Sequence, residues 1–151
     1  LDPVDGIDEG GRLVLRGPNV MRGYLSPDDP EKVDPLPGGW HDTGDIVDID
    51  KDGYVSILGR MKRFAKIGGE MVSLTAVEGL ASAVWPEARH AVVSIPDSRK
   101  GEKLVLVTDR RDADVARLAE WARSHGAPEL AVPKKIMRVA EVPVPPPRVR
   151  G

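Results

Sequence analysis

The chain has 151 residues, of which 40% are hydrophobic, 30% are charged and none is cysteine, and its net charge at pH 7 is −2. The missing cysteines exclude disulfides, thiolate catalysis and zinc–cysteine sites, and the charge balance argues against general nucleic-acid binding. No apolar run approaches the roughly 20 residues that a membrane-spanning helix needs. We therefore expect a cytoplasmic globular protein of one domain or two small lobes.

Residues 1–61 read as short strands joined by glycine- and proline-rich turns. Residues 12–16 place three consecutive apolar side chains between two arginines and predict a short half-buried strand. Residues 26–39 contain four prolines and two glycines and predict a loop. Two apolar runs, 45–49 and 54–58, flank an Asp-Lys-Asp-Gly turn and predict a hairpin. This part is therefore expected to be a small β-rich subdomain.

Residues 62–142 change to a mixed pattern and predict a separate lobe. Gly68 and Gly69 separate two short strands, and Ser73 is a plausible N-cap for a helix that ends near residue 84. The remaining expected elements are strands at 91–95, 104–107 and 135–139 and a helix at 112–124. The order ββαββαβ favours a small sheet covered by two helices, an α+β fold. The proline-rich residues 143–151 predict a disordered tail.

Thr43-Gly44-Asp45 is the first candidate site. A carboxylate held at a glycine turn can accept hydrogen bonds from two vicinal hydroxyls, as on a ribose. By its spacing alone, this tripeptide is more often a solvated turn, because Gly and Asp favour turns. The order of motifs around it carries more weight than the tripeptide itself. The ordered set is Gly11-Arg12-Leu13, Gly17, Gly23-Tyr24, Trp40 to Asp45, and Gly59-Arg60.

This ordered set resembles the acyl-adenylate-forming (AMP-binding) enzymes, the superfamily of acyl-CoA synthetases, adenylation domains and luciferases. The resemblance implies that Asp45 binds the ribose hydroxyls of AMP and that Arg60 contacts the ribose or a phosphate. It covers nearly all of this chain but only about the last quarter of the family's enzymes. The family's large N-terminal lobe is therefore an expected partner.

Lys62 lies in the basic run Arg60-Met61-Lys62-Arg63, where the β-rich part changes to the α+β part. Such a run is often only a solvated linker. The resemblance implies a sharper role, because Lys62 matches the hinge about which the family's C-terminal lobe rotates between its two half-reactions. A polar, exposed residue suits a hinge, which concentrates a large backbone change in few positions.

The loop of Lys66, Ile67, Gly68, Gly69 and Glu70 reads by itself as a tight β-turn. By resemblance it lines the tunnel for the acceptor's phosphopantetheine arm, with Gly69 leaving room for the thiol. The runs RFAKIGGEMVSL and PELAVPKKI are most similar to the acyl-acyl-carrier-protein synthetase half of bacterial 2-acylglycerophosphoethanolamine acyltransferase. The implied partner is acyl carrier protein, whose acidic surface would meet basic residues, with Lys134 and Lys135 as candidates. Scattered solubilising charge is the alternative.

No metal site is expected. Asp48, Asp50, Asp52 and Gly53 begin like an EF-hand calcium loop, but the twelfth position is Gly59 instead of glutamate and the flanks read as strands.

The terminal segment departs from the family pattern. The family has a lysine there that contacts the carboxylate and phosphate during adenylation, whereas residues 143–151 contain no lysine. We assign no catalytic residue in this segment and expect the isolated chain to be inactive, with no ligand bound.

The resemblance as a whole implies a fragment of an ATP- and Mg²⁺-dependent fatty acid ligase. It would form acyl-AMP, transfer the acyl group to the carrier thiol in phospholipid acyl recycling, and associate with the inner membrane when complete. The alternatives are an acyl-CoA synthetase fragment, or a non-catalytic module that docks a carrier protein or forms a homodimer.

Overall fold

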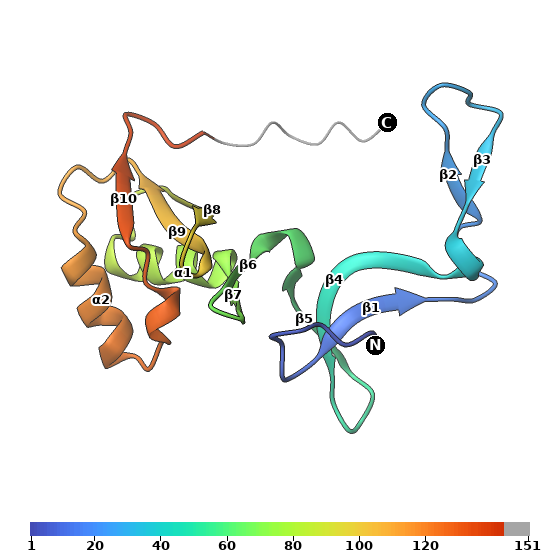
Figure 1. The fold of residues 1–151 in the computed structure, drawn as a ribbon, viewed down its shortest axis with the longest axis horizontal. Coiled ribbons are helices and arrows are strands. Elements are labelled where there is room, and N and C mark those ends of the chain that lie inside the picture. The colour runs from blue at the N-terminus through green and yellow to red at the C-terminus, as the bar shows by residue number, and fades with distance from the viewer. Residues whose placement is uncertain (144–151) are drawn as a thin grey trace. The chain divides into compact units, whose positions relative to one another are not determined.

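The computed structural model describes residues 1–143, so the predicted tail lies outside the described residues except for Pro143. The chain forms two compact units with the boundary between Lys62 and Arg63 (Figure 1). Each unit has its own sheets.

Unit 1 is built from five strands and a 3-10 turn. A three-stranded antiparallel sheet has the order β1-β4-β5, from β1 (Gly11–Leu15), β4 (His41–Ile49) and β5 (Val55–Arg60). A separate hairpin pairs β2 (Gly23–Leu25) with β3 (Val33–Pro35), and the turn η1 (Pro37–Gly39) follows. The predicted β4–β5 hairpin is confirmed. The prediction that residues 26–39 form a loop was wrong for their second half, because β3 and η1 lie there.

Unit 2 has the predicted order ββαββαβ, and the α+β expectation is confirmed (Figure 1). The turn η2 (Met61–Arg63) leads into the unit, and η3 (Glu129–Ala131) precedes its last strand. The other elements are β6 (Phe64–Ile67), β7 (Glu70–Ser73), α1 (Leu74–Val84), β8 (His90–Asp97), β9 (Gly101–Thr108), α2 (Val115–Ser124) and β10 (Lys135–Arg138).

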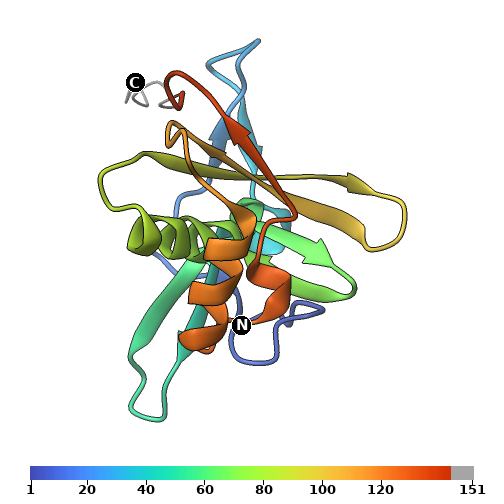
Figure 2. The same ribbon diagram turned by 90° about the vertical axis from the view of Figure 1, so that its left-hand side faces the viewer.

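The five-stranded sheet of unit 2 is organised around β9. β8 pairs antiparallel with β9 over the whole of both strands. β10 pairs parallel with the last four residues of β9, and β6 meets its first residue, Gly101. The helices α1 and α2 contact each other and cover the sheet (Figure 2). Their apolar faces form one core with the strands, which includes Trp85, Leu106 and Leu118.

Both helices begin at side-chain caps. Ser73 accepts a hydrogen bond from the Ala76 amide at 3.3 Å, as predicted. The second helix begins three residues later than predicted, because Asp114 is its N-cap and accepts from the Arg117 amide at 3.2 Å. Gly126 follows its end with φ +71°, which glycine adopts without strain.

Candidate functional site

Thr43, Gly44 and Asp45 form an irregularity in β4. Arg12 of β1 pairs with Ile46 and Val14 pairs with Asp42, so three residues of β4 lie opposite the single residue between Arg12 and Val14. Gly44 has φ +72°, a conformation that strongly favours glycine. Bulges of this kind change the direction of a side chain and are common beside functional sites.

The bulge places Asp45 against Arg60. The two residues are register partners in the β4–β5 pair, and Arg60 Nε lies 2.9 Å from Asp45 Oδ1. Arg60 Nη1 also donates to the Thr43 carbonyl at 2.8 Å. The Asp45 side chain is 19% exposed and the Arg60 side chain 59% exposed, so the carboxylate is sheltered while part of the guanidinium faces solvent.

Short hydrogen bonds hold the bulge in shape. The Thr43 hydroxyl donates to the Leu13 carbonyl at 3.0 Å and accepts from the Asp45 amide at 3.1 Å. The Gly44 amide donates to Asp42 Oδ1 at 2.9 Å. The result is a fixed carboxylate next to a fixed guanidinium. A carboxylate accepts from ribose hydroxyls and a guanidinium donates to ribose or phosphate oxygens, so this pair fits a nucleotide sugar.

Lys62, the predicted hinge, is exposed in η2, at the boundary between the units. Its neighbour Arg63 is fixed within unit 2: Arg63 Nη2 lies 2.6 Å from Glu78 Oε1. The rotation that the resemblance implies stays a prediction.

The predicted thiol loop, residues 66–70, contains the turn of the β6–β7 hairpin. Ile67 pairs with Glu70, which leaves Gly68 and Gly69 as the two turn residues, with φ +62° and +97°. Two-residue hairpin turns need such angles. A Cβ added at either glycine would meet no atom within 4 Å. The Gly68 amide donates to the Lys100 carbonyl at 2.9 Å, and the Lys66 amide donates to Glu102 Oε2 at 2.6 Å.

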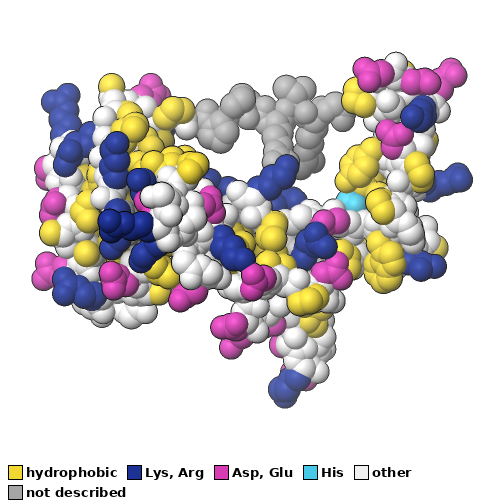
Figure 3. Space-filling view, viewed as in Figure 1, with side chains coloured by type: hydrophobic (Ala, Val, Ile, Leu, Met, Phe, Trp, Pro, Cys, Tyr) yellow, Lys and Arg dark blue, Asp and Glu magenta, His cyan; other side chains and the backbone are white. Residues whose placement is uncertain are grey.

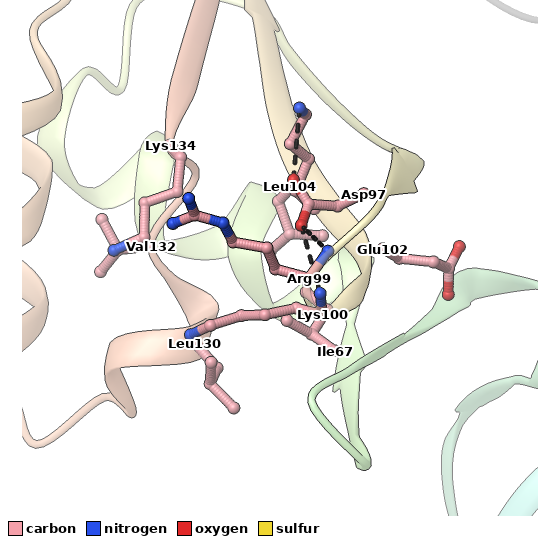
Figure 4. Close-up of a pocket in the computed structure, with 10 residues that line it drawn as sticks. Ile67, Asp97, Arg99, Lys100, Glu102, Leu104, Leu130, Val132 and Lys134 are labelled. Atoms are coloured by element: carbon pink, nitrogen blue, oxygen red, sulfur yellow. Dashed lines mark hydrogen bonds and ion pairs between the residues drawn. The ribbon is translucent and has the colours of Figure 1, made fainter.

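A pocket of about 220 Å³ lies beside this hairpin (Figure 4). Its apolar lining comes from Ile67, Leu104, Leu130 and Val132. Its cations are Arg99, Lys100, Lys103 and Lys134. Figure 4 shows Arg99 and Lys100 reaching across the pocket from the turn between β8 and β9. An apolar floor with several cations around it fits a ligand that carries both apolar groups and phosphates or carboxylates.

Acidic side chains hold part of this rim in place. The amides of Arg99 and Lys100 donate to Asp97 Oδ1 at 3.0 and 3.2 Å. These hydrogen bonds, with a contribution from Lys103, hold the pKa of the Asp97 carboxyl below its ordinary value. Lys134 Nζ lies 3.5 Å from Glu129 Oε1.

The predicted basic residues do not all share this pocket. Lys134 lines it, whereas the adjacent Lys135 is exposed in β10 and is not among its lining residues. Arg138 donates to the Ala113 carbonyl at 2.6 Å and so supports the fold around α2.

One aspartate of the segment that begins like a calcium loop stabilises a turn. Asp50 Oδ1 accepts from the amides of Asp52 and Tyr54, both at 2.9 Å, and so closes the β4–β5 turn. Among residues 1–143, no group of three or more His, Cys, Asp or Glu side chains is arranged to hold a metal ion.

Two curated relatives match nearly all of the chain. A 2-hydroxy-7-methoxy-5-methyl-1-naphthoate–CoA ligase of Streptomyces carzinostaticus is 32% identical over 93% of the chain and 26% of the relative. A 3-methylmercaptopropionyl-CoA ligase of Ruegeria lacuscaerulensis is 34% identical over 94% of the chain and 26% of the relative. The chain thus spans about a quarter of the length of these relatives. No family model matches it.

Solved structures match as well. ATP-bound MatB from Rhodopseudomonas palustris is 30% identical, with a TM-score of 0.68 over 90% of the chain and 27% of MatB. The amide bond synthetase McbA from Marinactinospora thermotolerans is 30% identical, with a TM-score of 0.66 over 91% of the chain and 28% of McbA. The chain matches the C-terminal part of AMP-binding acyl- and aryl-CoA ligases. The narrower resemblance to the acyl-carrier-protein branch stays a prediction.

Residues 1–143 contain no helix with the length and apolar composition needed to cross a membrane. Sequence reasoning missed three contributors to the candidate sites: the Thr43 carbonyl that holds Arg60, the Arg63–Glu78 pair, and Arg99 in the pocket. No local pattern marks any of them, because each depends on contacts between elements far apart in sequence.

Proposed function

We propose that the protein carrying this chain is an ATP-dependent acid–thiol ligase, in which Asp45 and Arg60 bind the AMP part of the nucleotide. The acid's carboxylate attacks the α-phosphate of ATP and gives acyl-AMP with loss of pyrophosphate. A thiol then attacks the acyl carbonyl and gives a thioester with release of AMP. The observation that carries the proposal is the sheltered Asp45 carboxylate held beside the half-exposed Arg60 guanidinium.

The opposite charges of Asp45 and Arg60 support the assignment of a nucleotide site. Asp45 offers oxygens to the vicinal hydroxyls of ribose, and Arg60 retains donors that a phosphate or ribose oxygen can use. Mg²⁺ would accompany ATP through its phosphates, which is how this ion usually binds in such enzymes.

The nucleotide site can be tested on the chain itself by NMR titration with AMP. We expect weak binding, roughly millimolar, with shifts centred on Gly44, Asp45 and Arg60. The same titration with 2′,3′-dideoxy-AMP removes the hydroxyls and should abolish these shifts. Asp45→Asn should weaken binding at least about tenfold, whereas Asp48→Asn, a matched change in the same strand, should not. Equal effects of both variants would refute the ribose assignment.

The activity itself needs the adenylating lobe in place. Acid-dependent exchange between ATP and pyrophosphate, measured on that larger protein, tests the first half-reaction. We expect residues 1–143 alone to show no exchange. A folded larger protein that exchanges no pyrophosphate with any acid in a panel of fatty and aryl acids would overturn the ligase proposal.

We further propose that the acceptor is a phosphopantetheine thiol and that the cationic pocket binds the phosphate of this arm. The Gly68 amide joins the glycine turn to Lys100, so the proposed thiol loop and the pocket are neighbours in unit 2. The names of the relatives favour coenzyme A as the carrier of this thiol. Acyl carrier protein, with its acidic surface, is the acceptor that the narrower resemblance implies.

Adjacent lysines provide a matched test of the pocket. Lys134→Glu should weaken acceptor binding at low salt at least about tenfold, because it reverses a charge in the pocket. Lys135→Glu makes the same change one residue outside it and should have a small effect. Titrations with coenzyme A and with holo carrier protein, compared with the apo form, identify the acceptor. Equal losses for the two variants would instead indicate a diffuse basic surface.

One observation favours a second candidate function, association through unit 1. Twelve of the fourteen exposed large hydrophobic side chains in the described chain lie in this unit, and Tyr54 and Ile57 are 74% and 71% exposed. Hydrophobic side chains reach the surface over its strands (Figure 3). Such a surface suits either an adenylating lobe or a second copy of the chain. Sedimentation should show association that Ile57→Ser weakens, and a monomer at all concentrations would exclude the homodimer.

A further inference from the structure

One arginine lies on each side of the boundary between the units, and Met61 and Lys62 separate the two. Arg60 is the last residue of β5 in unit 1, and Arg63 is the first residue of unit 2. Each is bound to side-chain and backbone groups of its own unit. The two residues between them include the exposed Lys62.

The unit 1 side is held by Asp45 and Thr43. Arg60 reaches Asp45 Oδ1 at 2.9 Å and the Thr43 carbonyl at 2.8 Å. Asp45 and Arg60 are the residues proposed to bind the nucleotide. A ribose at Asp45 therefore competes for the same carboxylate, and this contact can change with the state of the nucleotide.

The unit 2 side is held by a different set of groups. Arg63 Nη2 lies 2.6 Å from Glu78 Oε1, and Arg63 Nη1 donates to the Val92 carbonyl at 3.5 Å. The same Glu78 oxygen accepts the Val92 amide at 2.8 Å. The triangle of Arg63, Glu78 and Val92 joins the last residue of η2 to α1 and β8.

This triangle is sheltered. The Glu78 side chain is 24% exposed and that of Arg63 39% exposed, and Val92 is fully buried. Charge-assisted hydrogen bonds that are partly removed from water hold side chains more firmly than surface ion pairs do. Arg63 is therefore held firmly to unit 2, although it directly follows the predicted hinge residue, Lys62.

We propose that Arg63 is a positioning residue that fixes the unit 2 end of the hinge, so that rotation between the units is confined to Met61 and Lys62. The inference rests on the proposed function and on the rotation of the C-terminal lobe between its two half-reactions, which the resemblance implies. It extends that function by naming the residues that keep the hinge short. A short hinge reduces the number of orientations that the lobe samples and so favours a defined pair of arrangements.

The chain contains no cysteine, so spin labels can be placed at will. Lys51→Cys and Ser98→Cys put labels on exposed positions of the two units, and their distance distribution reports the hinge. Ser98→Cys with Ala116→Cys reports the fold of unit 2 alone. We expect Arg63→Gln to broaden the distribution between the units and to leave the distribution within unit 2 unchanged. The Val92 amide should also exchange at least about tenfold faster.

Three further variants separate positioning from general stability. Glu78→Ala frees Arg63 and should broaden the distribution between the units in the same way. Arg63→Lys keeps a charge for Glu78 but loses the forked contact with Val92, so its distribution should be intermediate and it serves as the test if Arg63→Gln does not fold. Arg110→Gln removes another arginine ion pair of unit 2, with Glu87 and Asp112, and should leave the distribution narrow.

The outcomes are distinct. A broader distribution for Arg63→Gln and Glu78→Ala but not for Arg110→Gln supports the proposal. A lower Tm without broadening, or equal broadening in all three, overturns it. An NMR titration with AMP separates this proposal from the nucleotide assignment. Chemical-shift changes at Arg60 with none at Arg63 agree with both the hinge proposal and the ribose site. The absence of any AMP effect would count against the ribose site while leaving the hinge measurement valid.

Discussion

The two units bury their hydrophobic side chains very differently. Unit 2 has a continuous core in which Trp85, Leu106 and Leu118 are at most 2% exposed. In unit 1 the buried hydrophobic residues of the described chain are Leu36, Ile46 and Val47. Unit 2 therefore has a core of its own, whereas unit 1 leaves most of its large apolar side chains exposed. The same contrast separates the two candidate sites, because the pocket lies in the unit with the larger core and Asp45 lies in the unit with few buried side chains.

The largest expected effect comes from separating the units. Residues 63–143 should unfold in one cooperative transition, because their core is complete. Residues 1–62 alone should show little or no cooperative unfolding, since so small a unit with few buried side chains is marginal. Thermal and urea unfolding followed by circular dichroism measures both, with residues 1–143 as the control. A sharp transition for residues 1–62 would break the comparison.

A matched pair of leucine truncations compares the cores directly. Leu106 is fully buried and Leu58 is 45% exposed. Leu106→Ala should lower the free energy of unfolding by about 2–5 kcal/mol through lost burial and the cavity that remains. Leu58→Ala should change it by less than about 0.5 kcal/mol. Urea unfolding of residues 1–143 measures both variants, and similar losses would mean that unit 1 has a core of comparable strength.

The helices and strands of unit 2 were predicted well, because short sequence signals mark where they begin and end. Ser73 caps a helix whose buried residues follow helical spacing, and the glycine pair marks the β6–β7 turn. Unit 1 was predicted less well. The strands β2 and β3 have three residues each, and β3 ends at Pro35, so composition indicated only a loop.

The candidate sites show the same limit. The nucleotide-binding roles of Asp45 and Arg60 were expected only from a resemblance in motif order, and their ion pair was not predicted. The bulge that aims Asp45 depends on the register between β1 and β4, which no short segment specifies. The pocket combines residues from β6, the β8–β9 hairpin and the η3 segment, and so could not be read from any one of them.

Glycine substitutions test whether backbone effects stay within one unit. Gly79 is an exposed helical residue with no atom within 4 Å of an added Cβ, so Gly79→Ala should stabilise unit 2 by about 0.5–1 kcal/mol. Gly126 has equal space but φ +71°, so Gly126→Ala should destabilise it by about 1 kcal/mol. Gly53→Ala strains the β4–β5 turn, where φ is +86°, and should leave the unit 2 transition unchanged. A shift of that transition by Gly53→Ala would show coupling between the units.

The smallest expected effect concerns two aspartates that close hairpin turns, Asp97 in unit 2 and Asp50 in unit 1. The amides of Arg99 and Lys100 lower the pKa of Asp97 in the folded state. A carboxyl with a lowered folded pKa contributes stability above its unfolded pKa of about 3.9 and loses it as the pH falls through the lower folded value. The two amides should therefore be protected from hydrogen exchange at pH 5 and lose protection progressively below about pH 4.

Asp97→Asn should remove this pH dependence, because the side chain no longer titrates. Asp50→Asn is the matched change in unit 1, where Asp50 Oδ1 accepts two amides in the same manner. It should weaken protection at Asp52 and Tyr54 and leave Arg99 and Lys100 unaffected. If Asp97→Asn kept the wild-type pH profile at Arg99 and Lys100, another group would control the turn. The turn at Asp97 forms one wall of the cationic pocket. If Asp97 controls the turn, acceptor binding by the wild-type protein should also weaken below about pH 4, and this pH dependence should be absent in Asp97→Asn.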